Sequence, residues 1–249
     1  LYYRRNPNSS MAVNHEIKTQ LAKLLATENF VVEHKDVNTA SFDVYDRILV
    51  LPLWKLASNV VYDLLVAHEC SHALFTPNED WRDKISVPLQ FVNVVEDARI
   101  EKLMKRKYPG LAKTFYQGYQ ELNDDDFFAI GDEDIDTFNL ADRINLHFKV
   151  GHFVDVAFST FEEPIVRIVE GCETFDDVLF ASELLYKFCK KDKEKGEDTT
   201  NEKVDSSPTS EEESKEDPVE NDVEEEEEKE EPEIKTDNAL SESIGDLND

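Results

Sequence analysis

The sequence predicts an α+β domain that is mainly helical, with a small antiparallel sheet near its start and an acidic tail at its end. Apolar residues recur at helical spacing between residues 13 and 190, whereas β-branched and aromatic residues alternate between about 30 and 53. All 25 aromatic residues precede residue 191. We therefore expect a flexible segment over 1–12, one folded domain over 13–190 and a separate tail over 191–249.

The first elements are an amphipathic helix and a hairpin. Ile17, Leu21 and Leu25 share one face of a helix predicted over residues 14–27. The segments FVVEHK and ASFDVYDRILVLPL then alternate as strands on either side of a DVNTA turn. The edge of this sheet could hold an extended peptide through main-chain hydrogen bonds, or the sheet could simply cover the next helix.

The apolar run VYDLLVAHECSHALF predicts a buried helix that carries the chemically most informative residues, HECSH at positions 68–72. His68 and His72 are four positions apart, so both imidazoles leave the same face and can bind one Zn²⁺. Glu69 is turned about 100° from His68, where it can act as general base on a water. A plain alternative is an amphipathic helix with two hydrogen-bonded histidines.

A second periodic segment, from Val87 to Gly110, should return along the first helix, with Ser86 as its cap. Glu96 lies among its apolar residues and is the predicted third metal ligand. Asp97 is the alternative ligand, or an acceptor that holds a histidine ring NH. Glu96 could instead pair with Arg99 on a solvated face.

These residues carry a resemblance to a known family. The stretch from about Met11 to Lys107, especially AHECSHALFTPNEDW and NVVEDARIE, resembles the metallopeptidase region of tailed-phage and bacterial proteins that have a C-terminal von Willebrand factor A domain. It is also similar to CobT-type cobaltochelatase subunits. The resemblance implies a zincin-like, HExxH gluzincin-type fold, with His68, His72 and Glu96 as metal ligands and Glu69 as base.

The remaining part of the domain offers weaker candidates. The acidic stretch 124–136 lacks the spacing of a calcium loop and favours a solvated lid. His147 and His152, and the tyrosines at 108, 116 and 119, are possible oxyanion donors but more typical of ordinary core or surface residues. Two core helices should end the domain, the second beginning with a capping box of Thr174 and Asp177.

The composition of the chain limits the classes of protein to which it could belong. Lys191–Asp249 holds 25 acidic and 7 basic residues, so it carries −18 of the net charge of −29 and should be disordered. Three widely spaced cysteines indicate reduced thiols in a cytoplasm, and no apolar run is long enough for a membrane span. The negative charge argues against direct binding of nucleic acid. Because Leu1 is not a methionine and the tail ends without a folded element, we expect a fragment of a longer product.

The function expected from the sequence is zinc-dependent hydrolysis of peptide bonds in a protein or peptide substrate. The alternative is a non-hydrolytic, CobT-like adaptor that serves a ring ATPase or chelatase, with the acidic tail as a tether towards a missing von Willebrand factor A domain. A further possibility is that the tail mimics nucleic acid and engages a basic partner.

Overall fold

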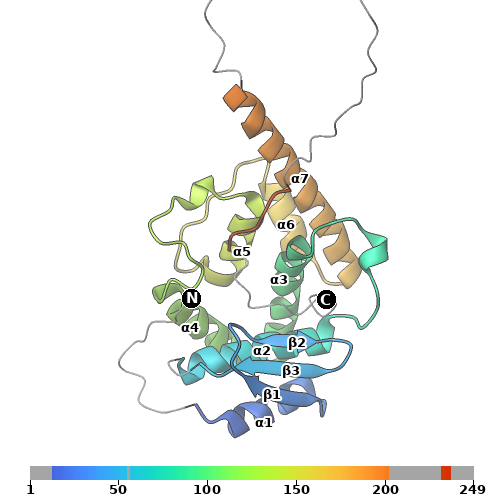
Figure 1. Ribbon diagram of the computed structural model, residues 1–249, viewed down its shortest axis with the longest axis vertical. Coiled ribbons are helices and arrows are strands. Elements are labelled where there is room, and N and C mark those ends of the chain that lie inside the picture. The colour runs from blue at the N-terminus through green and yellow to red at the C-terminus, as the bar shows by residue number, and fades with distance from the viewer. Residues whose placement is uncertain (1–12, 55–56, 202–230, 237–249) are drawn as a thin grey trace, which may run out of the picture.

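The computed structural model describes residues 13–54, 57–201 and 231–236 (Figure 1). Its described part is an α+β fold of seven α-helices, two short 3₁₀ helices and one three-stranded sheet. The elements are α1 His15–Ala26, β1 Val31–Lys35, β2 Ser41–Asp43, β3 Ile48–Pro52, α2 Asn59–Phe75, η1 Arg82–Lys84, α3 Leu89–Lys107, α4 Leu111–Asp124, η2 Ile135–Thr137, α5 Leu140–Val150, α6 Glu163–Gly171 and α7 Phe175–Asn201.

The sheet is mixed, with strand order β1-β3-β2, so the prediction of an antiparallel sheet was wrong in part. β1 runs parallel to β3, and only β2 and β3 form an antiparallel hairpin. The reversal occurs inside the stretch predicted as one strand, because Asp43 Oδ1 accepts hydrogen bonds from the backbone N–H groups of Tyr45 and Asp46. β3 takes the centre, where its fully buried Leu49 and Leu51 face the core.

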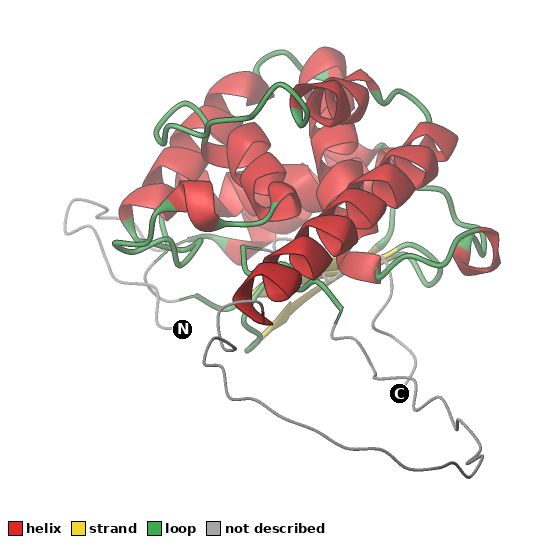
Figure 2. Cartoon of the chain, turned by 90° about the horizontal axis from the view of Figure 1, so that it is seen from above, coloured by secondary structure: helices red, strands yellow, loops and turns green. Residues whose placement is uncertain are grey.

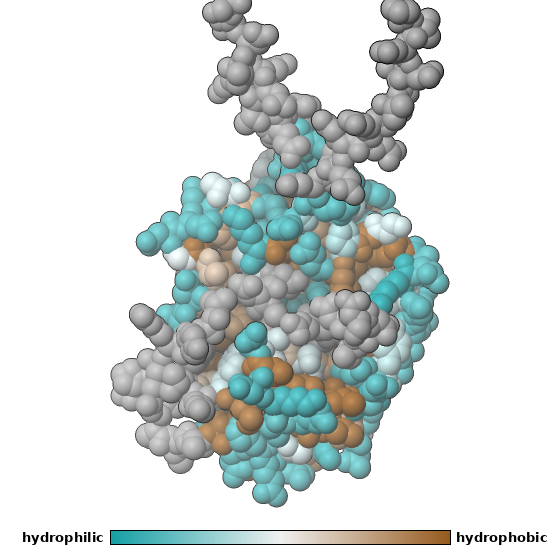
Figure 3. All heavy atoms as spheres, viewed as in Figure 1, coloured by the Kyte–Doolittle hydropathy of each residue, from teal (hydrophilic) through white to brown (hydrophobic). Residues whose placement is uncertain are grey.

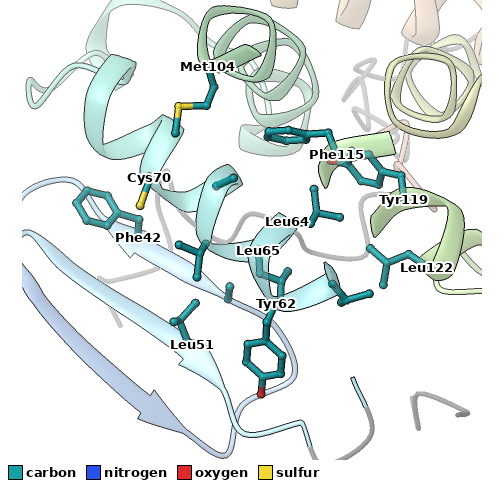
Figure 4. Packing of buried hydrophobic residues seen from close by; sticks show 14 of the residues in the cluster. Phe42, Leu51, Tyr62, Leu64, Leu65, Cys70, Met104, Phe115, Tyr119 and Leu122 are labelled. Atoms are coloured by element: carbon teal, nitrogen blue, oxygen red, sulfur yellow. The ribbon is translucent and has the colours of Figure 1, made fainter. Parts of the chain in front are cut away.

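Helix α2 lies at the centre of the first hydrophobic cluster. Ser58 caps it by accepting a hydrogen bond from the Val61 N–H, and most of its residues are buried on all sides. The sheet and α1 pack on one side of α2, and α4 packs on another (Figures 1 and 4). Apolar side chains remain at the surface over the sheet (Figure 3). Val31 and Leu53 are among the exposed large apolar residues.

Gly118 allows α4 to approach α2 closely. A Cβ atom built at Gly118 would lie 2.8 Å from Leu64 Cβ and 2.9 Å from Leu64 Cδ2, closer than such atoms come in folded proteins. Leu64 itself is fully buried and labelled in Figure 4. The helix that carries HECSH is therefore held at a distance from α4 that only glycine permits.

We expect Gly118→Ala to lower the free energy of unfolding by about 1–3 kcal/mol, because overpacking at Leu64 outweighs the helix propensity that alanine gains. Urea unfolding of the two proteins measures the difference. Gly110→Ala is the matched control, since a Cβ there meets nothing within 4 Å. A Gly118→Ala variant as stable as the wild type would contradict the close packing.

The second hydrophobic cluster is formed mainly by α3, α5, α6 and α7. Seen from above, the helices lie over the small sheet and hide most of it (Figure 2). Helix α3 belongs to both clusters, because Met104 packs in the first while Phe91, Val92 and Val95 pack in the second. Helix α3 also contacts α2 directly. Like α5, which has Leu146 in the first cluster and Ile144 in the second, α3 therefore joins the two halves of the domain.

The predicted helix boundaries hold to within a few residues. Asn14 caps α1, and Thr174 and Asp177 form the predicted capping box at α7, each accepting the other's backbone N–H. The predicted cap of the EDARIE helix, Ser86, is wrong, since α3 begins at Leu89 after Pro88 and no side chain caps it.

Among the described residues, no helix combines the length and apolar composition that crossing a membrane requires.

Two parts of the predicted tail belong to the fold. Helix α7 continues to Asn201, and residues 231–236 lie against the second cluster, where Ile234 is buried. The average composition of residues 191–249 did not reveal these two parts, because most of the acidic residues lie in the chain between them. The remaining tail residues, and the segment 1–12 predicted to be flexible, lie outside the described residues.

Candidate metal centre

The two histidines of HECSH lie side by side on α2, as the four-residue spacing predicts. Their ring centroids are 5.2 Å apart, and both side chains are fully buried. Histidine burial on this scale is costly unless each ring nitrogen has a partner. The surroundings of the four nitrogens therefore decide what the pair can do.

Asp97, on α3, brings its carboxylate to both rings. Its Oδ1 lies 3.6 Å from His68 Nε2 and 3.4 Å from His72 Nε2. The three atoms have no hydrogen-bond partner among the described residues. They lie within 4.8 Å of one another, so the group could hold a metal ion. In a tetrahedral site with bonds of about 2.0–2.1 Å, ligand atoms lie about 3.3 Å apart, which the two distances to Asp97 approach.

Nδ1 of His68, the ring nitrogen that does not face Asp97, is held by a carboxylate. Nδ1 lies 3.0 Å from Glu101 Oε1, which also accepts a hydrogen bond from the Tyr119 hydroxyl. Lys105 approaches the other oxygen of Glu101 at 3.4 Å. A carboxylate accepts hydrogen bonds, so Nδ1 carries the proton and the lone pair of Nε2 faces Asp97.

Nδ1 of His72, the ring nitrogen that does not face Asp97, is held by a hydroxyl. Thr76 Oγ1 donates to Glu96 Oε1 at 2.6 Å, and His72 Nδ1 lies 2.9 Å from Thr76 Oγ1. Since the single hydroxyl proton is committed to Glu96, Thr76 accepts the proton of His72 Nδ1. Both histidines thus have the tautomer that metal ligation through Nε2 requires.

Glu96, the predicted third ligand, is engaged elsewhere. Its two oxygens accept hydrogen bonds from Arg99 Nε and Nη2, both at 2.7 Å. The pair is buried rather than solvated, and Arg99 also donates to the Phe75 carbonyl at the end of α2. The structure therefore brings the predicted alternative, Asp97, to the histidines and places Glu96 and Arg99 behind His72. Neighbouring residues point about 100° apart around a helix, so α3 directs the carboxylate of Asp97 to the histidines and that of Glu96 away from them.

Lys149, on α5, holds the other oxygen of Asp97. Its ammonium lies 2.8 Å from Oδ2, and both side chains are almost fully buried. Oδ1 is thereby directed to the histidines while Oδ2 is neutralised. Three helices, α2, α3 and α5, converge on this one carboxylate.

The buried cluster carries more negative than positive charge. Four buried carboxylates, at positions 69, 96, 97 and 101, face two buried cations, Arg99 and Lys149, so the formal balance is −4 + 2 = −2. Lys105, about one third exposed, approaches only from the rim. Buried charge of this kind is stable when it is compensated, and a divalent cation between Asp97 and the histidines would compensate it.

The buried charges of the cluster also shift the pKa values of His68 and Asp97. Burial alone would lower the pKa of His68, but the charge of Asp97 and the hydrogen bond to Glu101 raise it above its ordinary 6.5. Burial alone would raise the pKa of Asp97, but the Lys149 ammonium and the charge of His68 hold it far below its usual range. Without a metal, His68 is therefore the group that takes up a proton.

Metal affinity should consequently fall with decreasing pH from a point above pH 6.5. A raised pKa of His68 means that protons compete for Nε2 at a higher pH than at an ordinary histidine, and metal binding releases that proton. Competition with a chromophoric chelator across pH 5.5 to 8.5 measures this. Affinity that stays level down to pH 6 would contradict the environment described for His68.

Glu69, the predicted base, is also fully buried. Its negative charge contributes to raising the pKa of His68 and that of Tyr119. Burial, followed by the charge of Glu101, raises the pKa of the Tyr119 hydroxyl well above 10. The hydroxyl is therefore a proton donor at neutral pH, and its partner is Glu101.

Sequence reasoning missed three residues of the site: Thr76, Glu101 and Lys149. Two of them had a local signal. Thr76 is four residues beyond His72, and Glu101 is four residues beyond Asp97, so each falls on the same face as the ligand it follows. Lys149 had none, because 52 residues separate it from Asp97.

The other candidates lie outside this group. His147 packs against Phe148 and Phe158, and His152 against Tyr116 and Phe153. Cys70 is a core residue whose thiol donates to the Ala22 carbonyl, as its position on the helix predicts.

The features that define the site are thus a His68–His72–Asp97 group, its outer hydrogen bonds and the buried Glu69. They come from α2 and α3, with Lys149 of α5 behind Asp97. A comparison of the chain with protein-family models, with curated proteins and with solved structures found no match.

Proposed function

We propose that the chain is a zinc-binding hydrolase domain of the metallopeptidase type, with His68, His72 and Asp97 as the metal ligands. The observation that carries the proposal is the convergence of three buried atoms from α2 and α3 that have no hydrogen-bond partner within the described part of the chain. Two imidazoles and one carboxylate form a ligand set typical of catalytic zinc. A zincin-like fold is part of the proposal, supported by a sheet that precedes and packs on the HECSH helix.

The protein's own residues have separate roles in this reaction. A bound zinc ion supplies Lewis acidity, which polarises a scissile carbonyl and makes a water acidic. Glu69 accepts the proton of the attacking water and returns it to the leaving nitrogen. Glu101 and Thr76 orient the histidines, while Lys149 orients Asp97.

Metal content and peptide cleavage together test the proposal. We expect one zinc per chain after purification, and cleavage of a mixed peptide library that stops on chelation and returns with added zinc. The His68→Ala variant controls for metal bound elsewhere. Zinc at one equivalent in His68→Ala, or no zinc in the wild type, would contradict the assignment.

A second candidate function is a non-hydrolytic adaptor in which the same ions and residues stabilise the fold. The complete burial of the ligands and of Glu69 favours this candidate, because a substrate must reach a catalytic metal. Its signature is one equivalent of zinc, a lower melting temperature after chelation, and an uncut peptide library. A ring ATPase partner and a cytoplasmic location are proposals that accompany it.

A further inference from the structure

Residues 231–236, which we name the strap, are seated on the domain without regular secondary structure, and the chain bends at residues 235–236. They lie along α5 beside α7 in Figure 1. Pro232, Ile234 and Thr236 are buried, whereas the residues between them are exposed. This alternation is that of a strand with one face turned to a binding surface.

The backbone of the strap is bound by side chains of the domain. The Gln90 amide accepts from the Ile234 N–H at 3.3 Å and donates to the Pro232 carbonyl at 3.4 Å. Asn139 donates to the Glu233 carbonyl at 2.7 Å. Gln90 thus pairs with the strap as a neighbouring strand would, which requires an extended ligand.

Thr236 is recognised by its side chain. It is 2% exposed, and its N–H and hydroxyl both reach Asp142 Oδ1, at 2.6 and 2.8 Å. Asn145 donates to the Thr236 carbonyl at 2.9 Å and to its hydroxyl at 3.2 Å. Asp142 and Asn145 are buried, so a residue without a hydroxyl would leave a buried carboxylate short of a donor.

Ile234 supplies an apolar contact, in addition to the polar contacts of the strap backbone and of Thr236. It is 9% exposed and belongs to the second hydrophobic cluster. Outside the groove, Glu231 accepts from the Tyr186 hydroxyl at 2.8 Å and Lys235 pairs with Glu133 at 3.5 Å. The inward residues therefore carry selectivity, and the outward ones add surface contacts.

We propose that the face formed by α3, α5 and α7 is a peptide-binding groove selective for extended segments of the pattern Pro-x-Ile-x-Thr, and that this chain's own strap is its tethered occupant. The chain between α7 and the strap spans residues 202–230, with 15 acidic and 3 basic residues and little that is apolar. Recognition therefore resides in the strap. The proposal is independent of the zinc chemistry.

A labelled peptide of residues 229–238 tests the groove on the full-length chain. In the Ile234→Asp, Thr236→Val variant the strap is released, and the peptide should bind at least about tenfold more tightly than to the wild type, whose tethered strap competes at high effective concentration. The matched control, Glu233→Gln with Lys235→Gln, changes outward residues and should behave as the wild type does.

Selectivity is tested with two further changes. A peptide with valine in place of Thr236 should lose binding, and so should the released variant that also carries Asn145→Ala. A folded released variant that does not bind the peptide, or that binds both peptides equally, would overturn the proposal. A concentration-dependent dimer that the released variant loses would assign the occupant to a second copy and would overturn the intramolecular arrangement.

A cut chain keeps the test decisive if the released variant fails to fold. A protease site inserted after residue 210 leaves strap and groove intact. After cleavage, the C-terminal piece should remain bound at high protein concentration and exchange with the labelled peptide on dilution. Immediate loss of the piece at high concentration, or no exchange with excess peptide, would contradict a reversible groove.

Discussion

Zinc affinity is expected to fall by more than about 100-fold in the Asp97→Asn variant and by only about 10–100-fold in the Glu96→Gln variant. The first change removes the charged ligand that faces both histidines, whereas the second removes only an outer interaction behind His72. Both substitutions conserve volume. Competition titration with a chromophoric chelator at fixed pH measures the two affinities.

Thermal unfolding of the metal-free variants is the control for this comparison. Glu96→Gln weakens a buried ion pair with Arg99, so it should lower the melting temperature although its zinc affinity falls less than that of Asp97→Asn. A larger loss of affinity in Glu96→Gln than in Asp97→Asn would return the third-ligand role to Glu96.

The Glu69→Gln variant is expected to keep its zinc and to lose peptide hydrolysis by about 10²–10⁴-fold in kcat. A general base contributes this much, and glutamine has the same size but accepts no proton. Cleavage of the best library peptide, with zinc content measured on the same sample, gives the result. Unchanged cleavage would remove Glu69 from the mechanism, and no cleavage by either protein would favour the adaptor.

The elements dominated by local periodicity could be predicted from the sequence. The HECSH helix is one, because a four-residue spacing places His68 and His72 on one face wherever the helix packs. The capping box at Thr174 and Asp177 is another, since it involves only neighbouring residues. The metal-capable pair of histidines is therefore a property of a single segment.

Which carboxylate of α3 faces the two histidines could not be predicted in this way. Glu96 and Asp97 are neighbours, so the choice depends on how α3 is rotated against α2, which packing decides. Arg99, three residues beyond Glu96, was the useful local indication, because such a spacing favours an ion pair. The buried position of that pair depended on the whole fold.

Long-range contacts account for the remaining differences. The parallel pairing of β1 with β3 involves segments that are not adjacent in the sequence, so the hairpin rule did not apply to β1. The strap lies in a tail whose average composition is strongly acidic, and its Ile234 and Thr236 find partners on α3 and α5, about 90 or more residues away. Composition alone carries no information on such contacts.

Anomalous X-ray diffraction at the zinc edge, from crystals of the full-length chain, is the most direct measurement of the central claim. The account predicts one strong peak at about 2.0–2.2 Å from Nε2 of His68, Nε2 of His72 and Oδ1 of Asp97. A peak bound instead to the Glu96 carboxylate, or no peak between the two histidines of a zinc-saturated protein, would contradict it.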